Sequence, residues 1–143
     1  SEMCIRDSVY TVRVLNQTES RDYALSSIKE LLRVAKPGGC VLVEFMNYHR
    51  RGFDRRRFRL GDATTNRGDV TNVRLTPSEV EKELRDCGAE IVWTKGIFFL
   101  GMTSYYSVPA WLLGLVRNID GLLGAVLPRL CSRVYVLARK AQG

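Results

Sequence analysis

The chain has 143 residues, of which 45% are hydrophobic, and a formal net charge of +7. This length and apolar content permit one globular domain with a buried core. No run of 18 or more apolar residues occurs, because Arg117, Asn118 and Asp120 interrupt the most apolar stretch, and this argues against a membrane-spanning helix. The four cysteines form no CxxC pair, which indicates a reducing compartment such as the cytoplasm.

The first part of the chain predicts a strand, a helix and a second strand. Residues 9–15 are rich in β-branched side chains and predict a buried strand of a parallel sheet. Apolar residues then recur at helical spacing over residues 20–35, and the Lys-Pro-Gly-Gly sequence at 36–39 ends this helix. Residues 40–45 predict the second strand. This order gives a βαβ crossover, which implies two parallel neighbouring strands.

The middle of the chain begins with a long irregular segment. Residues 46–75 show neither the helical nor the strand period, so we expect a functional lid or a poorly ordered connection. The Thr-Pro-Ser-Glu sequence at 76–79 then predicts a helix start with a capping box, and Gly88 ends that helix.

The last third of the chain predicts two strands separated by a second long excursion. Residues 90–101 predict a strand that is interrupted at Gly96, and residues 133–140 predict a final strand. Between them, apolar residues recur every three or four positions over residues 104–130. This spacing predicts an amphipathic helix, or a pair of helices broken near Gly121.

Three phrases of the chain resemble the C-terminal half of class I S-adenosylmethionine-dependent methyltransferases. IKELLRVAKPGGCVLVEF at 28–45 is similar to that family's approach to its fifth strand, although Ala35 replaces the usual Leu. GAEIV at 88–92 is similar to the step into the sixth strand, and VYTVRVLNQ at 9–17 to the fourth strand and its exit. The resemblance covers residues 9–140. It implies an α/β fold: a Rossmann-like class I methyltransferase sheet, N-terminally truncated, with strands 4 to 7 and flanking helices.

The resemblance also implies an activity. S-adenosylmethionine would be the cofactor, and a methyl group would pass to a small-molecule or lipid-like acceptor, a reaction of the EC 2.1.1 class. The family's glycine-rich cofactor loop has no counterpart in the chain, so we expect this fragment to be inactive alone and to bind the cofactor weakly. Residues 1–8 resemble the translation of a sequencing adaptor, and we expect 9–143 to be the C-terminal half of a methyltransferase domain.

The candidate site residues follow the exits of the two predicted parallel strands, because ligands of open α/β sheets lie outside the carboxyl ends of the strands. On the resemblance, cofactor-binding residues are expected at Thr11, Val12, Arg13 and Gln17. Substrate-binding residues are expected at Asn16, Asn47 and Tyr48. A hydroxyl acceptor would need a general base, for which His49 and Glu44 are the candidates, whereas a carbon or amine acceptor would need only alignment. No metal is expected. Each candidate also has an ordinary alternative as core, turn or surface.

Two surface features suggest further partners. Six arginines lie within ten residues, at Arg50, Arg51, Arg55, Arg56, Arg57 and Arg59. Such a patch is ordinarily a solvated face, but it suits an anionic acceptor or an anionic membrane, whereas nucleic acid is not expected without a recognisable motif. The alternative function is a non-catalytic α/β module that binds an anionic membrane or nucleic acid through this patch. The stretch 104–130 either covers the sheet, or forms an interfacial helix or a pocket wall for a lipid-like acceptor.

Overall fold

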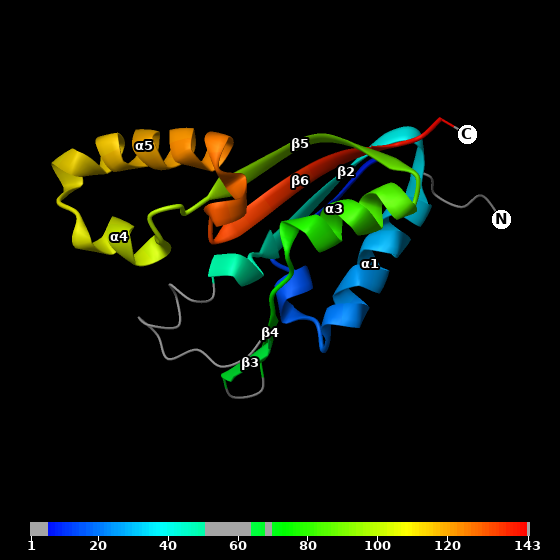
Figure 1. The fold of residues 1–143 in the computed structure, drawn as a ribbon, viewed down its shortest axis with the longest axis horizontal. Helices are drawn as coiled ribbons and strands as arrows, with labels where there is room; N and C mark the ends of the chain where they lie inside the picture. The colour runs from blue at the N-terminus through cyan, green and yellow to red at the C-terminus, as the bar shows by residue number, and fades with distance from the viewer. Residues whose placement is uncertain (1–5, 51–63, 68–69, 143) are drawn as a thin grey trace.

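The fold consists of a four-stranded sheet with two helices on one face and two excursions at one end, one of which contains a two-stranded hairpin (Figure 1). A computed structural model describes residues 6–50, 64–67 and 70–142. Residues 1–5, 51–63, 68–69 and 143 lie outside this description, as do the side chains of residues 6, 50, 64–67, 70–72 and 102–104. The arginine patch predicted at Arg50–Arg59 therefore lies outside the described residues.

The central sheet contains β1 (Arg6–Thr11), β2 (Ala35–Met46), β6 (Arg133–Lys140) and β5 (Ala89–Ile97), hydrogen-bonded in that order. β1 and β2 run parallel, which confirms the predicted parallel pair. β6 is antiparallel to both of its neighbours, β2 and β5. The final strand occupies residues 133–140, as the alternation in the sequence predicts.

The first strand lies earlier in the chain than the sequence predicts. It spans Arg6–Thr11 instead of residues 9–15, because the chain leaves the sheet at Arg13, whose φ of 60° no strand accommodates. The next residues form a 3-10 turn, η1 (Leu15–Gln17). β2 likewise begins at Ala35, where it pairs with Arg6, rather than at Cys40.

Two helices, α1 (Arg21–Val34) and α3 (Pro77–Asp86), cover one face of the sheet (Figure 1). The Ser20 side chain caps α1 by accepting a hydrogen bond from the backbone N–H of Tyr23 at 3.2 Å. At the start of α3, Thr76 and Glu79 form the capping box that the sequence predicts. Burial raises the pKa of the Glu79 carboxyl, but hydrogen bonds from Arg21 and Thr76 outweigh it, so the pKa is lowered overall.

The hydrophobic core lies between this face of the sheet and the two helices. Helix α1 contributes apolar side chains at four-residue spacing, and β2 and β6 contribute alternate residues. The fully buried members include Ala24, Ile28, Val41, Val43, Val80, Leu84, Val134 and Val136. Since the opposite face of β2 and β6 carries Glu44, Arg133 and Tyr135, the two faces of the sheet differ in chemistry.

The excursion between β2 and α3 is more regular than the sequence predicts. Its described residues include a 3-10 turn, η2 (Tyr48–Arg50), and a hairpin of β3 (Thr64–Arg67) and β4 (Val70–Val73). The hairpin strands are short and contain Thr and Asn, so they carry little of the apolar alternation that marks a strand. Val73 and Leu75, at the end of the excursion, are buried in the core.

The excursion between β5 and β6 contains α4 (Met102–Ser107), η3 (Ala110–Leu112), α5 (Leu113–Val126) and η4 (Pro128–Leu130). Of the two alternatives for this stretch, the helix pair broken near Gly121 is wrong, because α5 runs through that residue. The helices separate at Val108 and Pro109 instead, since a residue before proline is disfavoured in a helix. Within the described residues, no helix is long and apolar enough to cross a membrane.

Gly96 and Gly124 allow α5 to pack against β5. The predicted interruption of β5 at Gly96 is wrong, because Gly96 pairs with Val134 and the strand continues to Ile97. A Cβ atom on Gly124 would overlap the carbonyl oxygen of Gly96, and a Cβ atom on Gly96 would overlap the Cys131 side chain. The backbones of α5 and β5 are therefore in direct contact.

The two glycines of α5 provide a matched test of this packing. We expect Gly124→Ala to destabilise the fold by about 1 to 3 kcal/mol, because a backbone must shift to make room for the methyl group. Gly121→Ala, with nothing within 4 Å of its added Cβ, should instead stabilise the helix by roughly 0.5 to 1 kcal/mol. Urea unfolding measures both values. Equal effects of the two substitutions would contradict the close approach.

Candidate functional site

Three strands leave the sheet at the same edge, which we call the carboxyl edge. β1 and β2 are parallel, and β5 runs in the same direction as β2 because both are antiparallel to β6. The exits of these strands, η2, the β3–β4 hairpin and the α4–α5 excursion all lie at this end of the molecule (Figure 1). Ligands of open α/β sheets bind at such an edge, so the candidate site lies here.

Glu44 joins the exit of β1 to β2 and β6. Its carboxylate is only 2% exposed, accepts a hydrogen bond from the backbone N–H of Arg13 at 2.9 Å and forms an ion pair with Arg133. Burial and the Glu44 charge raise the pKa of the neighbouring Tyr135 hydroxyl. Since both carboxylate oxygens are engaged, the structure assigns Glu44 to holding Arg13 in its left-handed conformation. A proton-accepting role for Glu44 stays a prediction.

Asn47 holds the start of η2 against the end of the second excursion. The side chain is fully buried, and its Nδ2 donates to the backbone oxygens of Arg129 at 2.6 Å and Cys131 at 2.9 Å. Its Oδ1 accepts a hydrogen bond from the backbone N–H of His49 at 3.0 Å. The side-chain amide of Asn47, which the sequence predicts to contact the substrate, therefore makes its hydrogen bonds to the protein backbone.

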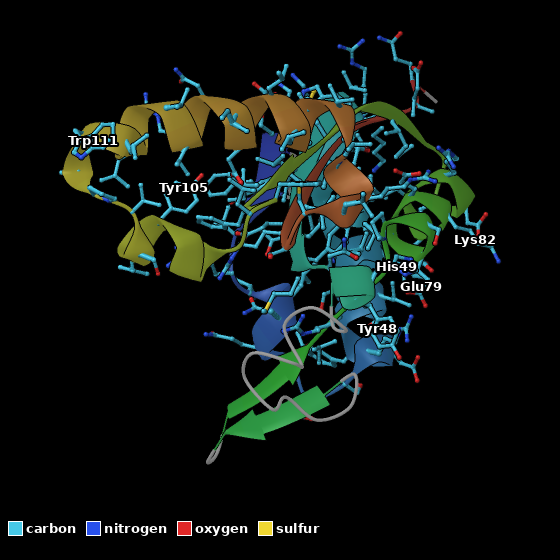
Figure 2. The ribbon with its side chains drawn as sticks, turned by 60° about the vertical axis from the view of Figure 1, so that its left-hand side comes forward. Tyr48, His49, Glu79, Lys82, Tyr105 and Trp111 are labelled. Carbon is cyan, nitrogen blue, oxygen red and sulfur yellow. The ribbon has the colours of Figure 1, made fainter. Side chains whose placement is uncertain are left out.

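Tyr48 and His49 lie at the outer side of this edge. The His49 ring is exposed and meets the Tyr48 ring edge-on, with 6.5 Å between centroids. The Arg21 guanidinium lies 5.6 Å from the centre of the Tyr48 ring and also pairs with Glu79. Figure 2 shows Tyr48, His49 and Glu79 on the same side of the molecule, well away from Trp111. The described contacts do not link His49 to Glu44.

The predicted cofactor residues at the exit of β1 divide into buried and exposed side chains. Thr11 is buried, and its hydroxyl has no hydrogen-bond partner among the described residues. Val12, Arg13 and Gln17 are exposed, while Asn16, predicted to bind substrate, is buried in η1. The unpaired hydroxyl oxygen of Thr11 therefore lies where the sequence predicts residues that line the cofactor site.

A cleft of about 410 Å³ adjoins Thr11 between β1 and α1. No sequence pattern predicted this cleft. The cleft is lined by Thr11, Val14, Leu15, Tyr23, Ser26, Ser27, Glu30, Leu31 and Val34. Four of these residues share one face of α1, because they are spaced three or four positions apart: Tyr23, Ser26, Ser27 and Glu30. This partly polar helix face is the sequence feature that could have predicted the cleft.

Asp120 fastens α5 over the end of β5. It is 4% exposed, and its two carboxylate oxygens accept hydrogen bonds from the backbone N–H groups of Phe98 and Leu100, each at 3.0 Å. Burial and a hydrogen bond to Asp120 raise the pKa of the Tyr105 hydroxyl to about 12. In the sequence, Asp120 stands out only as an interruption of an apolar stretch. Asp120 is the only acidic residue in that stretch, and this is the sequence feature that could have predicted a structural role for it.

The described residues contain no group of three or more His, Cys, Asp or Glu side chains placed to hold a metal ion. Cys40, Cys87 and Cys131 are free thiols.

Comparison with known proteins identifies the fold. No protein-family model matches the chain, and no curated protein matches it. A solved S-adenosylmethionine-dependent methyltransferase from Methanosarcina mazei is similar over 98% of this chain, with 16% identity and a TM-score of 0.62. A second similar structure is the Burkholderia thailandensis 1,6-didemethyltoxoflavin-N1-methyltransferase with bound S-adenosylhomocysteine, at 13% identity and a TM-score of 0.51 over 94% of this chain. A third is the [4+2]-cyclase SpnF, at 18% identity and a TM-score of 0.50 over 98% of this chain.

These likenesses establish the architecture. The chain has the fold of S-adenosylmethionine-dependent methyltransferases, and the predicted Rossmann-like sheet is confirmed. The chain spans 61%, 44% and 51% of the lengths of the three structures just named. Because a shared fold hosts different chemistries, as the cyclase shows, the activity has to be argued from the site.

The Glu44–Arg133 pair can be tested by removing its positive partner. Arg133→Met should destabilise the fold by about 3 to 5 kcal/mol, because the buried Glu44 carboxylate loses its counter-charge. Arg139→Met, an exposed position on the same strand, is the control. Thermal unfolding gives the comparison, and an equal loss of stability in the two variants would contradict the assignment.

The Tyr105–Asp120 contact predicts an alkaline transition. A hydroxyl whose pKa rises from 10.0 to about 12 on folding stabilises the fold below pH 10.0, and this contribution is lost as the pH rises toward 12. Subtracting the tyrosinate absorbance of Tyr105→Phe from that of the wild type isolates the titration of Tyr105. In Asp120→Asn the titration should shift to lower pH. An unchanged midpoint would show that Asp120 does not govern Tyr105.

Proposed function

We propose that the chain belongs to an S-adenosylmethionine-dependent methyltransferase that acts on a small-molecule or lipid-like acceptor. The observation that carries the proposal is the unpaired Thr11 hydroxyl, buried beside a cleft at the exit of β1 in a methyltransferase fold. A buried hydroxyl without a partner costs about 1 to 3 kcal/mol, so its retention favours a polar partner from outside the described residues.

The residues at the exit of β1 fit one wall of a cofactor site. Thr11 would offer a hydroxyl, and the exposed Val12, Arg13 and Gln17 would offer apolar contact and hydrogen bonds. Glu44 fixes the backbone of Arg13, so this wall is preorganised without the ligand. When bound, S-adenosylmethionine supplies a methyl group activated by a positively charged sulfur.

The outer part of the carboxyl edge would receive the acceptor. Methyl transfer is an in-line displacement, so the protein chiefly aligns the acceptor and excludes water. Tyr48 and the exposed His49 lie at this edge, and the His49 ring can take a proton from a hydroxyl acceptor. Asn47 would act by positioning His49, because its amide bonds to the protein.

The apolar character of the second excursion supports a small or lipid-like acceptor rather than a polar polymer. Tyr105, Leu112 and Leu113 are partly buried in the excursion that covers the end of β5. The proposed activity falls in the EC 2.1.1 class. We further propose that this chain alone binds the cofactor weakly and is inactive by itself, because a single wall of the site is identified among its described residues.

Photolabelling tests the proposal and tolerates weak binding. Ultraviolet irradiation of the chain with methyl-tritiated S-adenosylmethionine should label a peptide containing residues 11–17, and excess S-adenosylhomocysteine should suppress the label. Thr11→Val should reduce labelling yet keep or raise stability, since it removes a buried polar atom that has no protein partner.

Thr18→Val is the matched control. The Thr18 hydroxyl is buried but donates to the Leu15 backbone oxygen at 2.9 Å, so its loss should lower stability by about 1 kcal/mol. Labelling per folded molecule should remain at the wild-type level. Label confined to other peptides, or insensitive to S-adenosylhomocysteine, would refute the proposed function.

A further inference from the structure

The face of the sheet opposite α1 and α3 carries a row of apolar side chains, which we call the second-face row. Residues paired directly across neighbouring strands present their side chains on the same face. The strand registers place one such row across all four strands, with Tyr10 on β1, Leu42 on β2, Leu137 on β6 and Trp93 on β5. None of these four side chains belongs to the hydrophobic core or packs against it. Tyr10 is 74% exposed, and the other three are partly exposed.

A sheet with two apolar faces requires a cover on both. Helices α1 and α3 cover one face (Figure 1), where alternate strand residues such as Val43 and Val136 are buried. Residues 40–45 are apolar on both faces apart from Glu44, which is typical of strands that are buried on both sides. Helix α5 contacts β5 at Gly96, nearer the carboxyl edge than the second-face row. The second-face row is therefore an apolar surface that crosses the whole sheet and that no described helix covers.

Two charges of opposite sign flank the second-face row on β5. Lys95 lies on one side of Trp93 and Glu90 on the other, and both charged residues are exposed. The partners of Glu90, Trp93 and Lys95 on β6 are Arg139, Leu137 and Tyr135, which follow one another on one face of that strand. Glu90, Trp93 and Lys95 are therefore successive members of the same face of β5, with the acid and the base on either side of the tryptophan.

A second copy of this chain complements this arrangement. A two-fold axis that runs along the second-face row sets each strand against the same strand of the partner, in the opposite direction. Lys95 of each copy then faces Glu90 of the other, while Trp93 packs on Trp93. The Glu44 carboxylate on this face is already paired with Arg133, so it leaves no unpaired acid under the partner. The contact therefore pairs opposite charges and buries apolar side chains together.

We propose that this chain forms a two-fold dimer in which the second-face rows of two copies pack against each other. Sheets that stack face to face lie about 10 Å apart and interdigitate the side chains of their inner faces. The dimer goes beyond the proposed methyl transfer and does not depend on it. Thr11 and the cleft beside it lie on the other face of the sheet, because Thr11 pairs with the core residue Val43.

Charge reversal on β5 tests the two-fold arrangement in analytical ultracentrifugation. The wild-type chain should sediment in a monomer–dimer equilibrium, with a dimer of twice the chain mass of 16.2 kDa. Lys95→Glu should raise the dimer dissociation constant about 10-fold or more, because two pairs of like charges then face each other across the contact. Glu90→Lys should do the same, and the double variant should return the dissociation constant to near the wild-type value. Lys82→Glu is the control, because Lys82 is an exposed lysine of α3, on the other side of the sheet (Figure 2).

A pair of tyrosine variants tests the apolar part of the contact. Tyr10→Ser removes the most exposed member of the second-face row and should raise the dimer dissociation constant roughly 10-fold, because less apolar area is buried. Tyr23→Ser removes a tyrosine that is 59% exposed on α1, and should leave the dissociation constant unchanged. Circular dichroism of each variant verifies that the fold is retained.

Three results would overturn the proposal. The first is a chain that sediments as a monomer up to the highest concentration tested, which would leave this face to a different polypeptide. The second is a dimer whose dissociation constant is the same in the wild type and in both single charge reversals. The third is a dimer that Leu122→Ser on α5 weakens and Tyr10→Ser does not, which would assign the contact to exposed apolar residues of α5. None of these results depends on photolabelling by S-adenosylmethionine, so failure of the dimer and failure of the proposed function are distinguishable.

Discussion

The double pairing of β6 is the constraint on which the rest of the structure depends. β6 hydrogen-bonds to β2 on one side and to β5 on the other, and it is antiparallel to both. Because it runs back from the carboxyl edge, the chain between β5 and β6 has to lie at that edge, where β1 and β2 also end. β6 thus buries Val134 and Val136 in the core and brings the excursion between β5 and β6 to the end of the molecule where the parallel strands β1 and β2 exit.

Buried polar side chains then give these loops their geometry. Glu44 accepts from the backbone of Arg13, Asn47 donates to the backbone of Arg129 and Cys131, and Asp120 accepts from the end of β5. Each of these bonds ties a regular element to an irregular one far away in sequence. A buried polar group that lacks its partner is costly, so each segment has one strongly preferred position. The candidate site is therefore preorganised by buried side chains that bond to the backbone of distant segments.

The sequence by itself determined the elements whose signals are local. The caps at Ser20 and Thr76, the alternation of β6 and the parallel pair around α1 all follow from residues near one another in the chain. Tertiary structure alone decided that β1 ends before Arg13, that α5 continues through Gly121, and that Glu44 pairs with Arg133, 89 residues away. It also decided that the amide of Asn47 serves the protein. The physical reason is that strand ends, buried ion pairs and loop anchors depend on partners that only folding brings together, whereas caps and periodicity are properties of a single segment.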